Sequence, residues 1–198
     1  SSWCDFSEAP LFASDSDISH GIALFDIDLD GDLDAVVANE RATQILYSWV
    51  DFTGPGNEHS KLYINDGFGN FTAGPDDFAA NGVSTKHIAI GDVNGDGFPD
   101  AAFSEVSCYG KGWIIEGGEN RLYLNQGTDG SGWHGFTEAS FIADSDYTDC
   151  IALGDLDGDS DADMGVGNGF TWTQTMSFPF GGQNRLYLND GSGVFTDG

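Results

Sequence analysis

The residues most able to do chemistry lie in three short acidic loops. The stretch GDVNGDGFPD, from Gly91 to Asp100, places a side-chain oxygen at every second position and adds a carboxylate four residues later. Similar stretches begin at Asp26 and Asp155. Such a cluster of like charges repels itself unless a cation neutralises it. Oxygens from loop positions 1, 3, 5 and 9, with the backbone carbonyl of position 7, form the all-oxygen cage that Ca²⁺ prefers.

The sequence therefore predicts three Ca²⁺ sites with matched ligands. They are Asp26, Asp28, Asp30, Asp34 and the carbonyl of Asp32; Asp92, Asn94, Asp96, Asp100 and the carbonyl of Phe98; and Asp155, Asp157, Asp159, Asp163 and the carbonyl of Asp161. Soft metals are disfavoured because no Cys or His falls inside any loop. The alternative is that each loop is a solvated Asp-Gly turn. Three copies at identical spacing argue against that alternative.

The three sites differ at the sixth loop position, where the chain must turn sharply. Gly31 and Gly97 occupy this position in the first two loops, and Ser160 occupies it in the third. A Cβ opposes such a turn, whereas glycine accepts it. We therefore predict that the third site is the least well formed.

The acidic loops belong to an internal repeat. IALFDIDLDGDLDAVV begins at Ile22, IAIGDVNGDGFPDAAF at Ile88 and IALGDLDGDSDADMGV at Ile151. A second block follows each one: KLYINDGFGNF from Lys61, RLYLNQG from Arg121 and RLYLNDGSGVF from Arg185. The first loop aspartate recurs after 66 and then 63 residues, a spacing typical of a repeat architecture.

Each repeat predicts four short strands and no helix. Strand one is 22–25, 88–91 or 151–154, directly before the acidic loop, and strand two is 35–38, 101–104 or 164–167. Strand three is the Leu-Tyr-Ile/Leu block, and strand four carries Phe71, Phe136 or Phe195. The stretches NDGFGNF and NDGSGVF before it are strong hairpin signals. Four antiparallel strands repeated radially form a propeller blade. The predicted fold class is all-β, with three β-propeller blades that form a partial propeller or a segment of a larger one.

The whole chain, 1–198, is interpreted as one propeller segment. The blades are 18–83, 84–146 and 147–198. SSWCDFSEA at the start matches SGWHGFTEA at 131–139, so 1–17 is interpreted as the last strand of a preceding blade with its connection. Three blades do not close a propeller. We therefore expect missing blades from a longer chain or self-association, for example a head-to-tail ring of copies.

The charge and composition exclude several classes of partner. The chain carries 33 Asp and Glu against 6 Lys and Arg, a net charge of −27, which repels nucleic acid and anionic lipid surfaces. It contains no apolar run of about 18 residues, so no membrane insertion is expected. Aromatics at 13% and hydrophobics at 39% are too frequent for a disordered acidic tail.

The connections between strands two and three are rich in aromatic residues and differ between repeats. They lie at the end of the blades opposite the acidic loops, and variable loops on a rigid scaffold often bind ligands. The candidate ligand-binding residues are Trp49, Phe52, Tyr109, Trp113, Trp172 and Phe178. The alternative is that these aromatics fill gaps between blades. Cys108 in one such connection and Cys150 at the start of the next blade are placed to form a disulfide.

The D-x-[DN]-x-D-x-x-x-D loop and the LYLNDGxGxF hairpin resemble the FG-GAP/VCBS repeats of integrin-type β-propellers, over nearly the whole chain. The resemblance implies a calcium-binding module of a secreted or cell-surface protein that mediates adhesion or binds carbohydrate or protein.

Two alternatives stay open: part of a propeller-fold polysaccharide lyase, and a spacer domain. A lyase must neutralise a uronate, and only Arg41, Lys86 and Lys111 remain beside the three repeat-matched cations. No nucleophile motif such as G-x-S-x-G occurs, so a non-enzymatic module is favoured.

Overall fold

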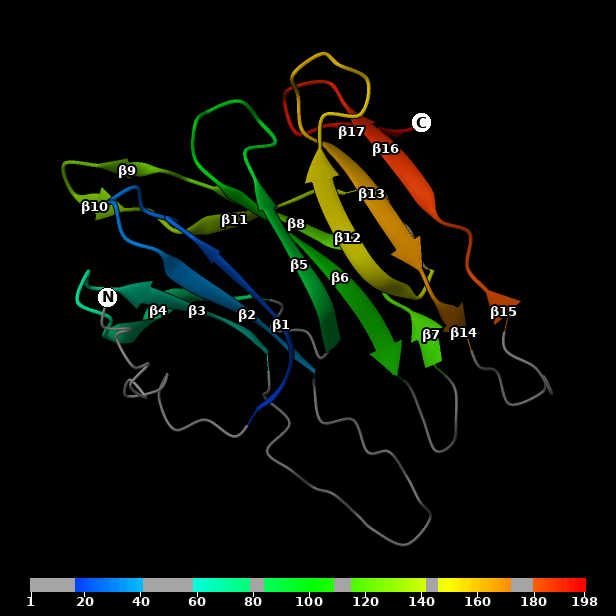
Figure 1. Ribbon diagram of the computed structural model, residues 1–198, viewed down its shortest axis with the longest axis horizontal. Helices are drawn as coiled ribbons and strands as arrows, with labels where there is room; N and C mark the ends of the chain where they lie inside the picture. The colour runs from blue at the N-terminus through cyan, green and yellow to red at the C-terminus, as the bar shows by residue number, and fades with distance from the viewer. Residues whose placement is uncertain (1–16, 41–58, 79–83, 109–114, 142–145, 172–179) are drawn as a thin grey trace, which may run out of the picture.

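The computed structural model of the protein describes residues 17–40, 59–78, 84–108, 115–141, 146–171 and 180–198. Within these ranges the chain is all-β and contains no helix. Three antiparallel sheets follow one another along the chain, and each lies within one predicted repeat (Figure 1).

Each of the three sheets is a meander in which sequential strands pair. The first contains β1 (Ile18–Phe25), β2 (Asp34–Glu40), β3 (Ser60–Asn65) and β4 (Phe71–Phe78). The second contains β5 (Ser84–Gly91), β6 (Asp100–Cys108), β8 (Arg121–Asn125) and β11 (Phe136–Ala139), with β7 (Ile115–Gly117) also paired to β6. The third contains β12 (Thr148–Gly154), β13 (Asp163–Asn168), β16 (Arg185–Asn189) and β17 (Phe195–Asp197). The prediction of four antiparallel strands in each repeat is confirmed.

Two short ribbons accompany these sheets. The first pairs β9 (Thr128–Asp129) with β10 (Gly132–Trp133), and the second pairs β14 (Phe170–Thr171) with β15 (Phe180–Gly181). The hairpin signals of the sequence did not predict either ribbon.

The first strand of each sheet is longer than the sequence predicts. β1, β5 and β12 begin three or four residues earlier than expected, and each has a register shift near its start, between Ser19 and Gly21, Thr85 and His87, or Thr148 and Cys150. The shift breaks the alternation of apolar residues, so the upstream part of the strand carries no period-two pattern.

The sheets pack face to face around two apolar cores. β5 contacts β1 and β2 on one side, whereas β12 contacts β5 and β6 on the other. Successive residues of β6 point to opposite faces. Ala101 and Phe103 therefore join the core with the first sheet, while Ala102 joins the core with the third. The second sheet is thus buried on both faces.

Aromatic contacts fill the first core. The ring of Phe78, from β4, lies 4.9 Å from that of Phe103, 5.2 Å from that of Tyr123 and 5.1 Å from that of Phe136. The last strand of the first sheet is therefore anchored on three rings of the second.

Candidate metal centres

Each acidic loop joins the first two strands of its sheet and lies against the hairpin that joins the last two. The hairpin glycine Gly67 is in close contact with the Asp32 side chain, Gly127 with Phe98 and Gly191 with Asp161. In all three sheets the hairpin thus meets the residue at loop position 7. The two kinds of loop share one end of each sheet, as expected from the strand order.

The three loops use one pattern of hydrogen bonds from the backbone to the carboxylates. A side-chain oxygen at position 1 accepts the N–H of position 6, one at position 3 accepts that of position 5, and one at position 5 accepts that of position 7. The position 1 bonds are Gly31 N to Asp26 Oδ2 at 3.1 Å, Gly97 N to Asp92 Oδ2 at 2.8 Å and Ser160 N to Asp155 Oδ2 at 3.1 Å. The position 3 acceptors are Asp28, Asn94 and Asp157, and the position 5 acceptors are Asp30, Asp96 and Asp159. The curl that the sequence predicts is therefore built by the acidic side chains themselves.

Positions 4 and 6 of each loop are in the left-handed region of the backbone. At position 6, φ is +101° for Gly31, +88° for Gly97 and +80° for Ser160. Ser160 therefore adopts the predicted turn in spite of its Cβ. At position 4 the first loop carries Leu29, with φ +59°, where the others carry glycine. The predictions from the sequence did not include this second strained position, although Gly95 and Gly158 at the matched place indicate it.

The position 9 aspartates Asp34, Asp100 and Asp163 are fully buried and link the loops to strand three. In each one, Oδ2 accepts the N–H of position 2 and Oδ1 accepts the N–H of the asparagine that ends strand three. The first pair is Ile27 N at 2.9 Å and Asn65 N at 2.8 Å, the second is Val93 N at 2.9 Å and Asn125 N at 2.8 Å, and the third is Leu156 N at 2.7 Å and Asn189 N at 2.8 Å. These carboxylates have a structural role besides any contact with a cation.

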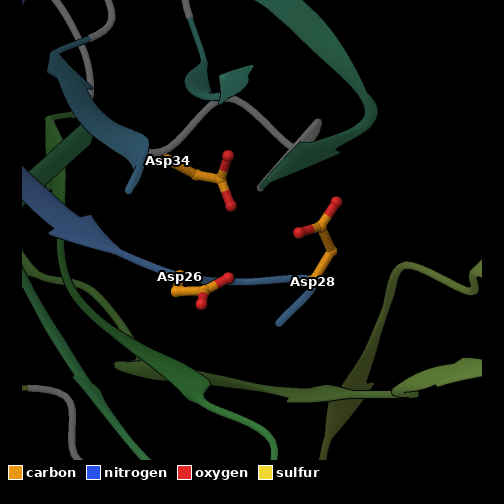
Figure 2. A group of neighbouring side chains, drawn as sticks. All are labelled: Asp26, Asp28 and Asp34. Carbon is orange, nitrogen blue, oxygen red and sulfur yellow. The ribbon is translucent and has the colours of Figure 1, made fainter. Parts of the chain in front are cut away.

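The first loop brings three carboxylates together (Figure 2). Oxygens of Asp26, Asp28 and Asp34 lie within 4.8 Å of one another. Asp26 Oδ1 is buried and has no hydrogen-bond partner. In the other two loops the matched oxygen accepts the position 4 N–H, at 2.8 Å from Gly95 and 2.6 Å from Gly158. A buried carboxylate oxygen without a donor, beside two further carboxylates, fits the donor set of a hard cation such as Ca²⁺.

The other two loops gather different subsets of the predicted ligands. In the third loop, Asp155, Asp157 and Asp159 form the close group, and Asp163 lies outside it. In the second loop, the amide of Asn94 replaces a carboxylate, and its Nδ2 donates to Asp96 Oδ2 at 3.0 Å. Asp30 lies outside the close group of the first loop. The ranking of the three sites by affinity stays a prediction.

Burial and like charges shift the acidity of several loop carboxyls. Burial raises the pKa of Asp100 to about 6 against its two hydrogen bonds, with a smaller contribution from Asp96 and Asp92. Burial, followed by the charges of Asp30 and Asp34, raises the pKa of Asp28. Burial also raises the pKa of Asp34, Asp157 and Asp161. A cation would relieve the charge crowding that contributes to these shifts.

Asp163 differs from the other position 9 aspartates. The hydrogen bonds from Asn189 and Leu156 lower its pKa. Its ionised form is therefore favoured in the fold even without a cation.

Asparagines that the sequence analysis did not single out connect neighbouring sheets at this end. Asn125 Nδ2 donates to the carbonyl of Ile27 at 2.8 Å, and Asn189 Nδ2 donates to the carbonyl of Val93 at 2.6 Å. Each carbonyl belongs to position 2 of the acidic loop in the preceding sheet. The LYLN blocks carried the signal, because asparagine recurs there in all three repeats.

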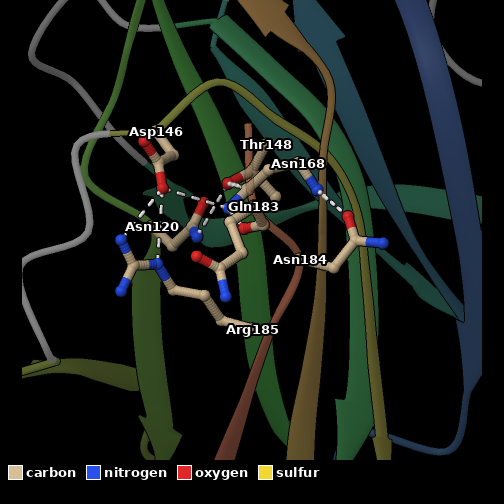
Figure 3. Close-up of polar contacts among 7 residues, drawn as sticks. All are labelled: Asn120, Asp146, Thr148, Asn168, Gln183, Asn184 and Arg185. Atoms are coloured by element: carbon tan, nitrogen blue, oxygen red, sulfur yellow. Dashed lines mark hydrogen bonds and ion pairs between the residues drawn. The ribbon is translucent and has the colours of Figure 1, made fainter. Parts of the chain in front are cut away.

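The three repeat-matched cations, Lys61, Arg121 and Arg185, pair with acids at the end of the sheets opposite the acidic loops. The pairs are Lys61 with Asp17, Arg121 with Glu138 at 2.9 Å and Arg185 with Asp146 at 3.1 Å. Figure 3 shows Arg185 and Asp146 beside the amides that end the third sheet. These cations therefore have a structural explanation.

Two other groups of predicted residues have different outcomes. The ligand-binding candidates Trp49, Phe52, Tyr109, Trp113, Trp172 and Phe178 lie outside the described residues. Cys150 is exposed and free, so the expected disulfide with Cys108 is not formed in this structure. The Cys150 sulfur lies instead in close contact with Gly167, its neighbour on β13.

Comparisons with known proteins gave no assignment. No model of a known protein family matches the chain, and the search of curated proteins found no relative. The resemblance to FG-GAP/VCBS repeats therefore rests on the loop and hairpin motifs alone. In the part of the chain that the structure describes, no helix has the length and apolar character needed to cross a membrane.

Proposed function

We propose that this chain is a calcium-binding β-propeller module of a secreted or cell-surface protein, in which each sheet is one blade and each acidic loop holds one Ca²⁺. The observation that carries the proposal is the cluster of Asp26, Asp28 and Asp34, with a buried Asp26 oxygen that has no donor. The hydrogen bond from the position 6 N–H to the position 1 carboxylate, which all three loops share, supports extending the proposal to the other two sites.

The role of the cation in this proposal is structural. The bound ion would neutralise the crowded carboxylates and fix the connection between the first two strands of each blade. A ligand that binds only the folded state adds its binding free energy to the stability of that state. The residues of each loop would act by holding the ion.

Equilibrium dialysis against Ca²⁺ tests the stoichiometry directly. Three ions per chain are expected for the natural sequence, and two for each of the single variants Asp26→Asn, Asp92→Asn and Asp155→Asn, which remove the position 1 carboxylate that all three loops share. Asp66→Asn is the matched control, because Asp66 lies in an exposed hairpin and accepts the N–H groups of Phe68 and Asn70. A chain that binds no Ca²⁺, or variants that bind as many ions as the natural sequence, would refute the proposal.

The proposed ligand of the module is a carbohydrate or a protein, taken up by the aromatic connections between strands two and three. This part of the proposal rests on the sequence and on the resemblance to adhesion propellers. A glycan array probed with the natural chain and with a variant lacking Trp49, Trp113 and Trp172 tests it. Equal binding by both would show that these aromatics do not form the ligand site.

The lyase alternative has less support. Its uronate-neutralising cation would have to be Arg41, Lys86 or Lys111. Arg41 and Lys111 lie outside the described residues, and Lys86 Nζ lies 3.3 Å from His20 Nε2. An assay of uronate polymers for unsaturated products, which absorb in the ultraviolet, would detect such an activity. We therefore keep the binding module as the proposal.

A further inference from the structure

Neighbouring sheets meet through one contact that occurs twice. At the acidic-loop end, the strand-three asparagine of the later sheet donates to the position 2 carbonyl of the earlier sheet. This bond is 2.8 Å long from Asn125 to Ile27 and 2.6 Å from Asn189 to Val93. The same two structural positions are therefore joined at both interfaces.

A second polar bond joins the sheets at the opposite end. Ser60 Oγ donates to Thr85 Oγ1 at 2.8 Å, and Asn120 Nδ2 donates to Thr148 Oγ1 at 3.0 Å (Figure 3). Ser60 is the first residue of β3, and Asn120 directly precedes β8, so both donors lie at the start of strand three of the earlier sheet. Both acceptors lie at the start of strand one of the later sheet. Ser60 therefore performs the role that Asn120 performs in the next repeat.

Between these two bonds the contact is apolar. The earlier sheet contributes its position 2 residue and the leucine of strand three: Ile27 and Leu62 at the first interface, Val93 and Leu122 at the second. The later sheet contributes the first isoleucine of its repeat, Ile88 or Ile151. The two interfaces therefore use the same residue positions of the repeat.

The third sheet carries the residue positions that an earlier sheet contributes to this contact, and no other sheet of the described residues covers them. Its position 2 residue, Leu156, is 53% exposed, whereas Ile27 and Val93 are each 1% exposed. Its strand-three leucine, Leu186, is 54% exposed, whereas Leu62 and Leu122 are nearly inaccessible.

Asn184 of the third sheet is also in place to donate. Its Oδ1 accepts the N–H of Asn168 at 3.0 Å, and Figure 3 shows its amide nitrogen directed away from these residues. Among the described residues the amide nitrogen has no acceptor.

The first sheet carries the residue positions that a later sheet contributes to this contact. Its isoleucine, Ile22, is 56% exposed, whereas Ile88 and Ile151 are 7% and 2% exposed. Ser19 occupies the hydroxyl position of Thr85 and Thr148 and is exposed. A hollow of about 400 Å³ on this face is lined by Ser19, Ile22, Val37 and Tyr63, among other residues.

The asparagine of the first sheet has a free donor as well. Asn65 Nδ2 donates to its own loop, at the carbonyl of Leu33, at 3.1 Å. Within the described part of the chain, it lacks the second bond that Asn125 and Asn189 make to a preceding sheet.

We propose that a second copy of this chain packs its first sheet onto the third sheet, head to tail, by repeating this contact. Asn65 of one copy would donate to the carbonyl of Leu156 in the other, and Asn184 would donate to the hydroxyl of Ser19. Leu156 and Leu186 would cover Ile22. The two faces of one chain complement each other because they are the two halves of an interface that the molecule already contains twice.

The two faces make this association heterologous, so each pair of copies keeps a free face until a ring closes. Each copy carries a net charge of −27, which opposes association at low ionic strength. Salt near 1 M reduces the screening length to about 3 Å. Association should therefore increase with salt and with Ca²⁺.

Sedimentation in Ca²⁺ and high salt tests the proposal through two complementary variants. Leu186→Glu spoils the face on the third sheet and Ile22→Glu spoils the face on the first, so each variant alone should sediment as a monomer of 21.0 kDa. The mixture retains one intact pair of faces and should give a 1:1 dimer, while the natural chain forms a dimer or a larger ring. Thr137→Glu is the control, because Thr137 is exposed on β11 of the second sheet, which belongs to neither of the two faces, and it should associate like the natural chain.

Both interface residues are exposed in the single chain, so circular dichroism should show that each variant keeps its fold. Three outcomes would overturn the proposal: a monomeric natural chain, single variants that still associate, or a mixture that stays monomeric. If the natural chain is monomeric, the two faces are left for sheets supplied by a different chain.

Discussion

Asp163 Oδ1 accepts a hydrogen bond of 2.8 Å from the backbone N–H of Asn189. This bond fixes the end of strand β16 to the acidic loop that begins the same sheet. The other oxygen of Asp163 accepts the N–H of Leu156 at 2.7 Å. One buried carboxylate therefore organises the loop before any cation binds.

We predict that Asp163→Asn lowers the melting temperature in EGTA, whereas Asp157→Asn does not. An amide has one acceptor oxygen, so one of the two N–H groups at Asp163 would lose its partner, and a buried unpaired donor is costly. Asp157 has a raised pKa from burial and from the charge of Asp159, and its neutral replacement relieves repulsion. Thermal unfolding of both variants in excess EGTA is the measurement. Equal melting temperatures would show that Asp163 has no structural role.

The left-handed turn at Ser160 predicts a stabilising substitution. A non-glycine residue in this backbone region costs about 1–2 kcal/mol, so Ser160→Gly should raise the free energy of unfolding by about 1 kcal/mol. It should also tighten Ca²⁺ binding at the third loop.

Gly97→Ser is the matched reverse change. Gly97 has φ +88°, and no atom lies within 4 Å of a Cβ placed there. The predicted loss, about 1–2 kcal/mol, is therefore purely conformational. Urea unfolding in Ca²⁺ compares the two variants. A Ser160→Gly variant no more stable than the natural chain would contradict the assigned strain.

Glu105 should make stability depend on pH. It is fully buried, with one oxygen unpartnered, and burial raises its pKa from 4.5 to about 7. Above pH 4.5 the unfolded chain releases this proton while the folded chain keeps it, so the contribution to stability falls as pH rises. The loss is complete above about pH 7 and amounts to roughly 3 kcal/mol for a shift of this size.

Glu105→Gln removes that dependence. The free energy of unfolding of the variant minus that of the natural chain should increase by about 2 to 3 kcal/mol between about pH 5 and pH 8.5. Comparing differences cancels the titration of the many surface carboxylates. A difference that stays constant over this range would show that Glu105 is ionised in the fold at the lower pH.

An asparagine that joins two sheets, such as Asn189, should contribute more to the free energy of unfolding than Asn65, which does not join two sheets within the described part of the chain. Asn189→Ala leaves the buried carbonyl of Val93 without its donor, a loss of about 1–3 kcal/mol. Asn65 donates its amide only within its own sheet among the described residues, so Asn65→Ala should be less destabilising. Urea unfolding of both variants at low protein concentration measures the difference. A larger loss for Asn65→Ala would contradict the role of Asn189 between sheets.

The sequence predicted the four-strand repeat and the curl of the acidic loops because both depend on local patterns. The period-two alternation after Ile22 and the DxDxD spacing act over a few residues, and the same conformation recurs in all three copies. Ser160 was recognised as a strained position for the same reason.

Other features depend on contacts between residues far apart in the chain. The bond from Asn125 to Ile27 spans 98 residues, and no local pattern shows which carbonyl the amide meets. The register shift at the start of β1, β5 and β12 removes the alternation that would have revealed the longer strands. The expected disulfide was wrong for this structure because loop position alone does not bring two sulfurs together.

Thermal unfolding in excess EGTA, followed by addition of Ca²⁺ or Mg²⁺, shows whether the three acidic loops hold structural Ca²⁺. The melting temperature should fall greatly in EGTA, and Ca²⁺ but not Mg²⁺ should restore it, because the loops offer many flexible oxygens rather than a strict octahedron. A melting temperature that is unchanged by EGTA would refute the proposed calcium sites and would leave the three acidic loops as solvated turns.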